Sequence, residues 1–246
     1  MKIFPLSEGA FTIDKTKLFI PFNLGADSMK ERTAGSLLVE IQPFVVVTSR
    51  DVLLLDTGLG FEVDGELQLI QNLRKAGIDP NRITKVLMSH LHKDHAGGIA
   101  YDSAEGRRTL TFPNATYYVQ RAEFEYVFEK GAPSYLPEEV EVLNHNDRVQ
   151  WLEGDGKIDN YIRHEITGAH SKYHQVFWIE DEGETVFFGA DDAPQLQQMK
   201  HRFAAKYDYD GKKAMELRSQ WWQQAAEEKW KMLFYHDIKS PIGENV

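Results

Sequence analysis

The sequence contains no cysteine among its 246 residues. This absence excludes disulfide bonds, thiolate nucleophiles and zinc sites built from cysteine, and it leaves histidine and carboxylate side chains as the available metal ligands. No apolar run approaches the roughly 18 residues that a membrane-spanning helix needs. Residues 1–10 are too polar for a secretory signal. We therefore expect a cytoplasmic protein with no membrane partner.

Basic residues are outnumbered by acidic ones, with 28 Lys and Arg against 38 Asp and Glu and a formal net charge of −10. This balance argues against a nucleic-acid partner, because non-specific binding of a polyanion depends on basic surface. Hydrophobic residues make up 42% and charged residues 27% of the chain, which is the usage of an ordinary globular protein. The length and the lack of a Gly/Ser/Pro-rich linker predict one domain over residues 1–246.

Short apolar runs rich in β-branched residues are separated by turn signals along much of the chain, a pattern typical of strands. The expected strands cover residues 37–41, 44–47, 52–55, 84–88, 116–120, 161–166, 175–179, 185–189 and 232–235. Helices are expected at residues 65–77, 194–206 and 211–229. This order of strands with interspersed helices predicts an α+β protein or one of mixed αβ layers.

Four side chains of metal-ligand type fall within six positions directly after an expected strand: His90, His92, Asp94 and His95. In an extended segment side-chain direction repeats every two residues, so His90 and His92 lie on one side and can hold one cation. Asp94 and His95 can turn toward a second cation. Small residues at 96–98 then let the backbone bend tightly. A lone histidine is more often a surface or core residue, but this spacing predicts metal binding.

Four further segments agree with this motif in order and spacing. They are Leu53 to Gly58 (LLLDTG), Thr167 to Ser171 (TGAHS), Phe187 to Asp191 (FFGAD) and Phe234 to Asp237 (FYHD). Together with the histidine motif they make the chain resemble the metallo-β-lactamase superfamily of metal-dependent hydrolases over nearly its whole length. The resemblance implies a four-layer αββα sandwich of the α+β class and a site for two divalent cations.

Carried over residue by residue, the resemblance implies seven metal ligands. The first cation takes His90, His92 and His170. The second takes Asp94, His95 and His236. Asp191 bridges the two cations. Nitrogen and oxygen ligands of this kind suit zinc best, and iron or manganese would tolerate the same set.

Two residues beside this set are alternatives that the sequence leaves open. Asp192 stands next to Asp191, and the superfamily usually places the bridging acid directly after glycine, whereas Ala190 intervenes here. Asp191 is preferred because it directly ends an apolar run. His174 follows His170 by four residues, and we expect it to support the site or to face the substrate rather than to bind a cation.

Asp56 is expected to orient a ligand imidazole, the support that metal-binding histidines usually receive, with turn capping as the alternative. Three histidines outside the matching segments are expected to be surface or structural residues: His145, His164 and His201. A serine-hydrolase site made of Ser89, His90 and Asp94 is excluded. Adjacent side chains point to opposite sides of a strand, and no nucleophile-elbow sequence surrounds the serine.

The implied chemistry is hydrolysis by a metal-bridged hydroxide, because two cations can lower the pKa of a shared water from 15.7 to about 7. One cation polarises the oxygen that becomes negative, and the other holds the leaving alkoxide. Asp94 is the expected catalytic residue, which takes the proton of the attacking water in addition to binding its cation. The substrate is expected to be a small molecule.

The missing cysteine argues against β-lactamase activity, because many zinc β-lactamases place a cysteine where Asp191 falls. The stretch from Ser7 to Phe22 resembles the opening of quorum-quenching lactonases and methyl-parathion-hydrolase-like proteins. The preferred substrate is therefore a lactone such as an N-acyl-homoserine lactone. A phosphotriester or another carboxylic ester is the alternative, and a catalytically inactive metal-binding protein is a remote one.

Aromatic residues supply candidates for a substrate pocket, although core packing is their commoner role: Phe11, Phe19, Phe22, Phe124, Tyr126 and Phe128. Some lactonases carry a tyrosine three residues after the bridging acid, and here that position is Pro194. Other tyrosines are candidates for the same role: Tyr173, Tyr207 and Tyr209. Three tryptophans are expected to pack against the sheet, with a homodimer surface left open: Trp221, Trp222 and Trp230.

Overall fold

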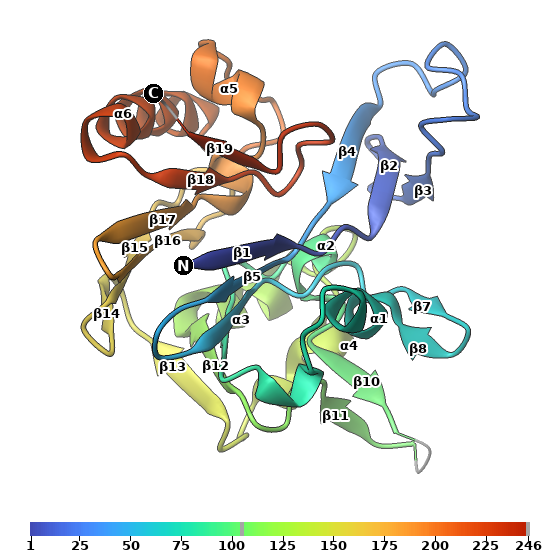
Figure 1. The fold of residues 1–246 in the computed structure, drawn as a ribbon. Coiled ribbons are helices and arrows are strands. Elements are labelled where there is room, and N and C mark those ends of the chain that lie inside the picture. The colour runs from blue at the N-terminus through green and yellow to red at the C-terminus, as the bar shows by residue number, and fades with distance from the viewer. Residues whose placement is uncertain (104–105, 245–246) are drawn as a thin grey trace.

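Two six-stranded sheets lie face to face, and helices cover the outer face of each sheet (Figure 1). The computed structural model describes residues 1–103 and 106–244. The layers follow the order helix, sheet, sheet, helix, which confirms the expected αββα sandwich and the α+β class.

The first sheet comes from the amino-terminal part of the chain. Its strands, in spatial order, are β1 (Lys2–Pro5), β5 (Phe44–Val47), β6 (Val52–Leu55), β9 (Lys85–Leu87), β12 (Thr116–Gln120) and β13 (Val149–Leu152). The strands from β6 to β13 are parallel, so their carboxyl ends meet at one edge. The helical segments that connect these strands are α1 (Gln68–Lys75), η1 (Pro80–Arg82), α2 (Lys93–Ala96), α3 (Arg121–Lys130), α4 (Pro137–Val140) and η2 (Glu141–Leu143).

The second sheet comes from the carboxyl-terminal part. Its strands, in spatial order, are β14 (Gly156–Ile158), β15 (Ile162–Ile166), β16 (Gln175–Asp181), β17 (Glu184–Phe188), β18 (Lys231–Leu233) and β19 (Ile242–Glu244). Only β17 and β18 pair in parallel, so the carboxyl ends of these two strands lie together. The helical segments of this part are η3 (Ala190–Asp192), α5 (Leu196–Lys200) and α6 (Gly211–Glu228).

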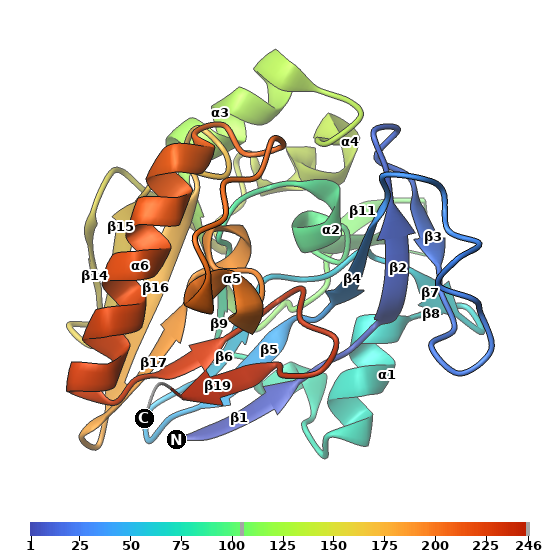
Figure 2. The ribbon, with the colours of Figure 1, turned by 90° about the horizontal axis from the view of Figure 1, so that it is seen from above.

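Three smaller sheets complete the protein. One has the strand order β3 (Phe19–Pro21), β2 (Gly9–Ile13) and β4 (Leu37–Ile41), and it stands out from the sandwich beside α2 (Figure 2). The others are the hairpins of β7 (Glu62–Val63) with β8 (Glu66–Leu67) and of β10 (Ala100–Asp102) with β11 (Arg108–Leu110). The three-stranded sheet will be called the arm, and it forms one wall of the cavity described below.

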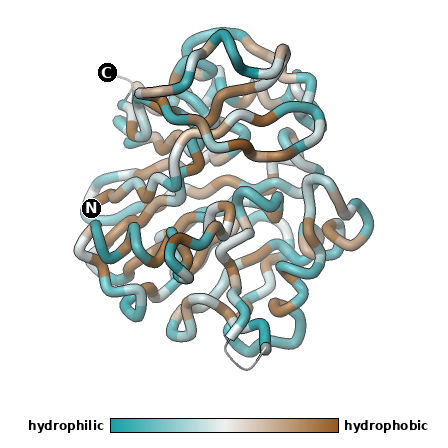
Figure 3. Tube along the Cα trace, turned by 90° about the vertical axis from the view of Figure 1, so that its right-hand side faces the viewer, coloured by the Kyte–Doolittle hydropathy of each residue, from teal (hydrophilic) through white to brown (hydrophobic). Residues whose placement is uncertain are grey.

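The core between the two large sheets is built from alternate residues of facing strands. Leu53 and Leu55 of β6 point into it and meet Phe177 and Phe188 of the second sheet, all of them fully buried. Leu54 points the other way, into the layer of α1 and α3. Because both faces of β6 are covered, its sequence is a continuous apolar run rather than an alternating one. Figure 3 shows hydrophobic stretches running through the middle of the molecule and hydrophilic residues along its outer loops.

A second core lies under α6, where tryptophans contact the outer face of the second sheet. The rings of Trp221 and Phe187 lie 4.9 Å apart between centroids, and those of Trp230 and Phe187 lie 5.5 Å apart. Trp222 is partly buried against the same cluster. The expectation that these tryptophans pack against the sheet is confirmed. In the part of the chain that the structure describes, no helix is long and apolar enough to cross a membrane.

Two expected helices are shorter than the sequence pattern indicated. The helix expected over residues 65–77 is α1, because residues 65–67 belong to the turn and second strand of the β7–β8 hairpin. Of the helix expected over residues 194–206, only α5 forms. It ends at Lys200, and the backbone of His201 is extended. The following loop is held by the Arg218 side chain, which donates to the carbonyl of Phe203. The helix α3 carried no clear periodic signal and was not expected.

Candidate metal centre

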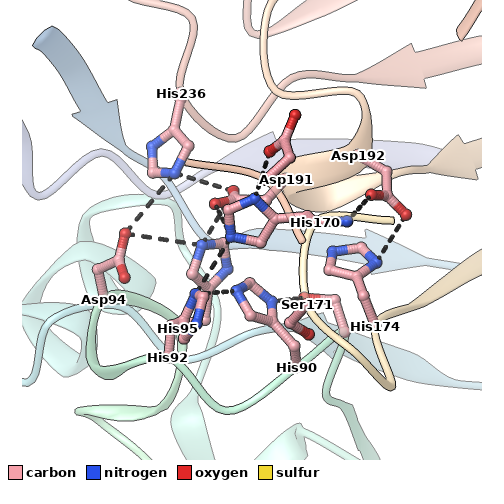
Figure 4. A network of polar contacts seen from close by, with 12 residues as sticks. His90, His92, Asp94, His95, His170, Ser171, His174, Asp191, Asp192 and His236 are labelled. Atoms are coloured by element: carbon pink, nitrogen blue, oxygen red, sulfur yellow. Dashed lines mark hydrogen bonds and ion pairs between the residues drawn. The ribbon is translucent and has the colours of Figure 1, made fainter. Parts of the chain in front are cut away.

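All seven residues of the expected ligand set converge at one edge of the sandwich (Figure 4). The carboxyl end of β9 leads into His90 and His92, and the short helix α2 carries Asp94 and His95. The second sheet supplies the remaining side chains from the loop after β15 and from the ends of the parallel strands β17 and β18: His170, Asp191 and His236. The site therefore forms where the two sheets bring their parallel strand ends together.

The first group of side chains surrounds one point with four possible ligand atoms. Nδ1 of His92 lies 2.9 Å from Nε2 of His90 and 3.2 Å from Nε2 of His170. Nε2 of His170 lies 3.1 Å from Oδ2 of Asp191. Burial, reinforced by the neighbouring imidazoles, lowers the pKa of His90 and of His92 well below the usual range. Neutral imidazole is the form in which histidine binds a metal.

The second group lies on the other side of the Asp191 carboxylate. Oδ1 of Asp191 is 2.9 Å from Nε2 of His236 and 3.1 Å from Nε2 of His95. Oδ2 of Asp94 is 3.6 Å from Nε2 of His236 and 3.7 Å from Nε2 of His95. The two oxygens of Asp191 thus face the two groups separately.

The donor set and its unpaired atoms fit divalent cations. Nε2 of His95 and Oδ1 of Asp191 are buried without a hydrogen-bond partner among the described residues, although they face each other. Burial favours the neutral acid, but the surrounding imidazoles hold the pKa of Asp191 well below its usual range. An ionised carboxylate flanked by imidazole nitrogens is a set of ligands that divalent cations of the first transition row accept.

Asp56 supports one imidazole of this cluster, the role expected for it from the sequence. Its Oδ2 lies 2.7 Å from Nδ1 of His95 and accepts a hydrogen bond from the Ser89 hydroxyl at 2.6 Å, while its Oδ1 accepts from the backbone N–H of Ser89 at 2.7 Å. A carboxylate bound at Nδ1 keeps Nε2 turned into the cluster. The Ser89 hydroxyl therefore helps to hold the Asp56 carboxylate in place.

Asp192 points away from the two groups and stabilises the loop that carries His170. Its Oδ1 accepts from the backbone N–H of His170 at 2.7 Å, and its Oδ2 lies 3.0 Å from Nδ1 of His174 and accepts from the hydroxyl of Thr167. Of the two neighbouring acids, it is therefore the carboxylate of Asp191 that faces the imidazoles. His174 is fully buried beside Asp192, which agrees with the supporting role expected for it.

Two supports of the cluster were not foreseen from the sequence. Oδ1 of Asp208 lies 2.9 Å from Nδ1 of His170, and the carbonyl oxygen of Glu40 lies 2.7 Å from Nδ1 of His236. Asp208 lies in the irregular loop after α5. This loop is held against the loop of His170 by a hydrogen bond from the N–H of Tyr209 to the His170 carbonyl at 3.0 Å. No local motif marks either support, since each contact joins residues far apart in the chain.

The histidines outside the motif have the structural or surface roles expected of them. His145 and His201 are exposed, and His164 is buried on β15 beside the ring of Phe177, 6.5 Å away between centroids.

A cavity of about 460 Å³ opens directly beside the cluster. The cluster side is formed by His92, Asp94, His170, Asp191 and His236, and the opposite wall by residues of the arm. A volume of this size suits a small molecule.

Most of the aromatic residues considered for a substrate pocket lie outside the cavity lining. Of the six, only Phe19 lines the cavity. Phe11 is buried in the core between the sheets, and Phe124 and Tyr126 are buried in the layer of α3. Phe128 is 48% exposed, and its ring centroid lies 5.1 Å from that of Phe124. Core packing, the commoner role of such residues, is therefore confirmed for Phe11, Phe124 and Tyr126.

Among the three candidate tyrosines, Tyr207 lines the cavity. Its ring centroid lies 6.0 Å from that of His170. Tyr173 packs instead on Tyr126 at 5.6 Å between centroids, and Tyr209 is 62% exposed and does not line the cavity.

Comparisons with known proteins bear on the family and the fold of this chain. The family described as the Metallo-beta-lactamase superfamily matches residues 40–218. A curated relative, N-acyl homoserine lactonase from Bacillus cereus, is 24% identical over 233 residues, which cover 86% of this chain and 87% of the relative. The solved structure of AidC, a dizinc quorum-quenching lactonase, has a TM-score of 0.73 and 20% identity and covers 98% of this chain and 89% of that one. That of the hydrolase AbOPH has a TM-score of 0.75 and 24% identity with the same coverage.

Proposed function

The chain belongs to the metallo-beta-lactamase superfamily and is a hydrolase, and from this premise we propose that it opens lactones with the help of two divalent cations. The preferred substrate class is the N-acyl-homoserine lactones, on which the curated relatives act according to their names. The single observation that carries the two-cation site is the carboxylate of Asp191, whose two oxygens face two separate groups of side chains.

The proposed ligands follow these two groups. The first cation would be held by His90, His92 and His170. The second would be held by Asp94, His95 and His236. Asp191 would bind both. Zinc is the preferred metal, because nitrogen and oxygen ligands in this number suit it, and the similarity to a dizinc lactonase supports the same choice.

When bound, two such cations supply a strong nucleophile from water at neutral pH and polarise the carbonyl of an ester. The protein must also supply a side chain that accepts the proton of the attacking water and passes it to the leaving group. Asp94 lines the cavity and its backbone is held by the hydroxyl of Tyr235, which donates to the Asp94 carbonyl at 2.6 Å. We assign to the Asp94 carboxylate the transfer of a proton from the attacking water to the leaving alkoxide.

Tyr207 is assigned a hydrogen bond to the carbonyl oxygen of the substrate. Tyr207 is 39% exposed, but partial desolvation of its hydroxyl at the cavity, reinforced by the negative charges of Asp208 and Asp191, raises the pKa of Tyr207 to about 12. The phenol therefore keeps its proton at neutral pH and can donate it to an oxygen on which negative charge develops. This hydroxyl takes the role that Pro194, three residues after Asp191, cannot fill.

The test is the ring opening of N-hexanoyl-homoserine lactone by zinc-loaded protein, with His92→Ala as the control. We expect the native rate to exceed that of the control by at least about a hundredfold, because the variant loses a proposed ligand of the first cation. A native protein that contains two metals and opens no lactone would overturn the lactonase assignment. Phosphotriesters and linear carboxylic esters, assayed in parallel, would then identify the alternative reaction.

A further inference from the structure

Four lysines line the cavity beside the proposed metal centre, in a chain whose net charge is −10. They come from three separate segments: Lys15 and Lys17 from the turn of the arm, Lys93 from α2, and Lys206 from the loop after α5. Outside the proposed ligands, Asp14 is the one acidic residue among the cavity's described lining. The positive charge is thus concentrated at the place where a substrate would enter.

These ammonium groups form no close ion pair with a carboxylate of the described residues, although Lys15 acts at longer range on Asp14 and Lys93 on Glu139. Within residues 1–103 and 106–244, none of the four lysines has a carboxylate oxygen within 4.0 Å of its nitrogen. The carboxylate of Asp14 accepts hydrogen bonds from the backbone N–H and the hydroxyl of Thr16, at 2.9 and 2.5 Å, and so is bound within its own turn.

Two of the lysines are held at the cavity by their backbone. Lys17 has a φ of 60°, in the left-handed region that favours glycine, and its N–H donates to the carbonyl of Asp14 at 3.0 Å. Lys93 stands in the sequence between the proposed ligands His92 and Asp94, so the positions of these two residues fix its backbone beside the site.

Their nitrogens lie over aromatic walls of the same cavity. Nζ of Lys17 is 5.8 Å from the ring centroid of Tyr207, and Nζ of Lys93 is 5.8 Å from that of Phe19. The remaining wall is apolar and is formed by Ile13, Leu37, Val39 and Pro194. A ligand that fits this lining has an apolar middle and an anionic end.

We propose that the substrate of this site carries an anionic group, separated from the ester or lactone by a short apolar chain and bound by the lysines of the cavity. The proposal rests on the proposed function, since it places the scissile bond at the metal centre. A neutral acyl chain would fill the apolar wall but would leave the half-buried Lys17 and Lys93 without an anionic partner, which costs free energy. A carboxylate and a phosphate satisfy the same requirement, because lysine binds either as a point charge.

The experiment compares two lactones of matched length, N-hexanoyl-homoserine lactone and its analogue with a carboxylate at the end of the same six-carbon chain. We expect kcat/KM of the native zinc-loaded protein to be about tenfold higher for the carboxylate, and the preference to weaken about threefold or more at 0.5 M NaCl. In the double variant Lys17→Met/Lys206→Met the preference should fall to about twofold or less. A third substrate with a terminal phosphate monoester shows which anion is preferred.

The control variant is Lys157→Met, which removes an exposed lysine on β14, outside the cavity lining. Both rates of this variant should equal those of the native protein. Equal rates of the native protein on the neutral and the carboxylated lactone would overturn the anionic-substrate proposal and leave the lactonase assignment intact.

A second measurement does not depend on catalysis. Calorimetry would compare the binding of two inert γ-lactams, in which N–H replaces the ring oxygen, one neutral and one with the terminal carboxylate. We expect the carboxylate to bind about tenfold more tightly to the native protein and to lose this advantage in the double lysine variant. Equal binding of the two lactams would contradict the proposal even if no lactone were opened, whereas a failure of ring opening alone would contradict only the lactonase assignment.

Discussion

Nδ1 of His170 lies 2.9 Å from Oδ1 of Asp208, a residue 38 positions further along the chain. The other nitrogen of the same ring faces Asp191, so the imidazole is held between two carboxylates. This pairing fixes the direction in which His170 presents Nε2 to the site. It also ties the loop after α5, which carries Tyr207 and Lys206 into the cavity, to the proposed metal centre.

Asp208→Ala is expected to weaken metal binding about 10–100-fold, because the ring of His170 would lose the carboxylate that orients it. The measurement is a competition for zinc against a chelator of known affinity. Asp147→Ala, at an exposed position before β13, is the matched control and should bind zinc like the native protein. Equal zinc affinity in the two variants would contradict this role of Asp208.

Asp191 and Asp192 are adjacent but should respond differently to the same substitution. Asp191→Asn is expected to lower the zinc content from about two ions per chain to about one or fewer and to reduce lactone opening at least about a hundredfold. Asp192→Asn should keep more of its zinc, because its carboxylate faces His174, Thr167 and a backbone N–H rather than the cluster. Elemental analysis after gel filtration measures the zinc content, and the reverse order of the two variants would refute the assignment.

Gly97→Ala is expected to destabilise the protein by about 3 kcal/mol, the upper part of the usual range for overpacking. A Cβ at this position would lie 2.2 Å from the carbonyl oxygen of Leu59, a backbone atom that cannot move aside on its own. Gly25→Ala is the control, because its Cβ would meet its nearest neighbour, Oδ1 of Asn23, at an ordinary 3.5 Å. Urea unfolding gives both free energies, and equal values for the two variants would contradict the prediction.

Glu8 should make the stability depend on pH. Burial raises its pKa to about 8, although Oε2 accepts from the N–H of Leu59 at 2.7 Å, and Oε1 is buried without a partner among the described residues. The folded state therefore keeps a proton that the unfolded state releases above its ordinary pKa of 4.5. This contribution to stability is full below pH 4.5 and is lost as the pH rises toward about 8.

Glu8→Gln cannot ionise and should remove this dependence. Its free energy of unfolding should rise relative to that of the native protein between pH 5 and pH 8, by up to about 1.4 kcal/mol per pH unit. Glu62→Gln, on the exposed hairpin strand β7, should follow the native protein at every pH. Urea unfolding across this range measures the difference, and parallel curves for native protein and Glu8→Gln would show the prediction to be wrong.

Tyr207→Phe is expected to lower kcat of lactone opening about a hundredfold, the size of effect found when a donor to a developing negative oxygen is removed. Tyr209→Phe removes the same hydroxyl from an exposed tyrosine two residues away and should leave kcat unchanged. Steady-state kinetics of the two variants decide the point. If both variants keep the native kcat, the hydroxyl of Tyr207 has no part in the reaction.

Much of the fold could be predicted because strand periodicity is a local property. The continuous apolar runs of β5 and β6 were readable without any tertiary contact. The helix expected over residues 194–206 was mostly wrong for the opposite reason. There the extended loop is stabilised by Arg218, which reaches it from α6, and a local pattern carries no information about such a contact.

The sequence by itself determined the proposed ligand cluster of α2 and of the loop between β9 and α2, because the spacing of His90, His92, Asp94 and His95 sets the direction of each side chain within a few bonds. Only the tertiary structure decided that Asp191 rather than Asp192 faces the imidazoles, that Asp208 supports His170, and that lysines from three segments meet at one cavity. These relationships join residues that lie tens of positions apart. They depend on sheet register and on the docking of loops, which no single segment of the chain specifies.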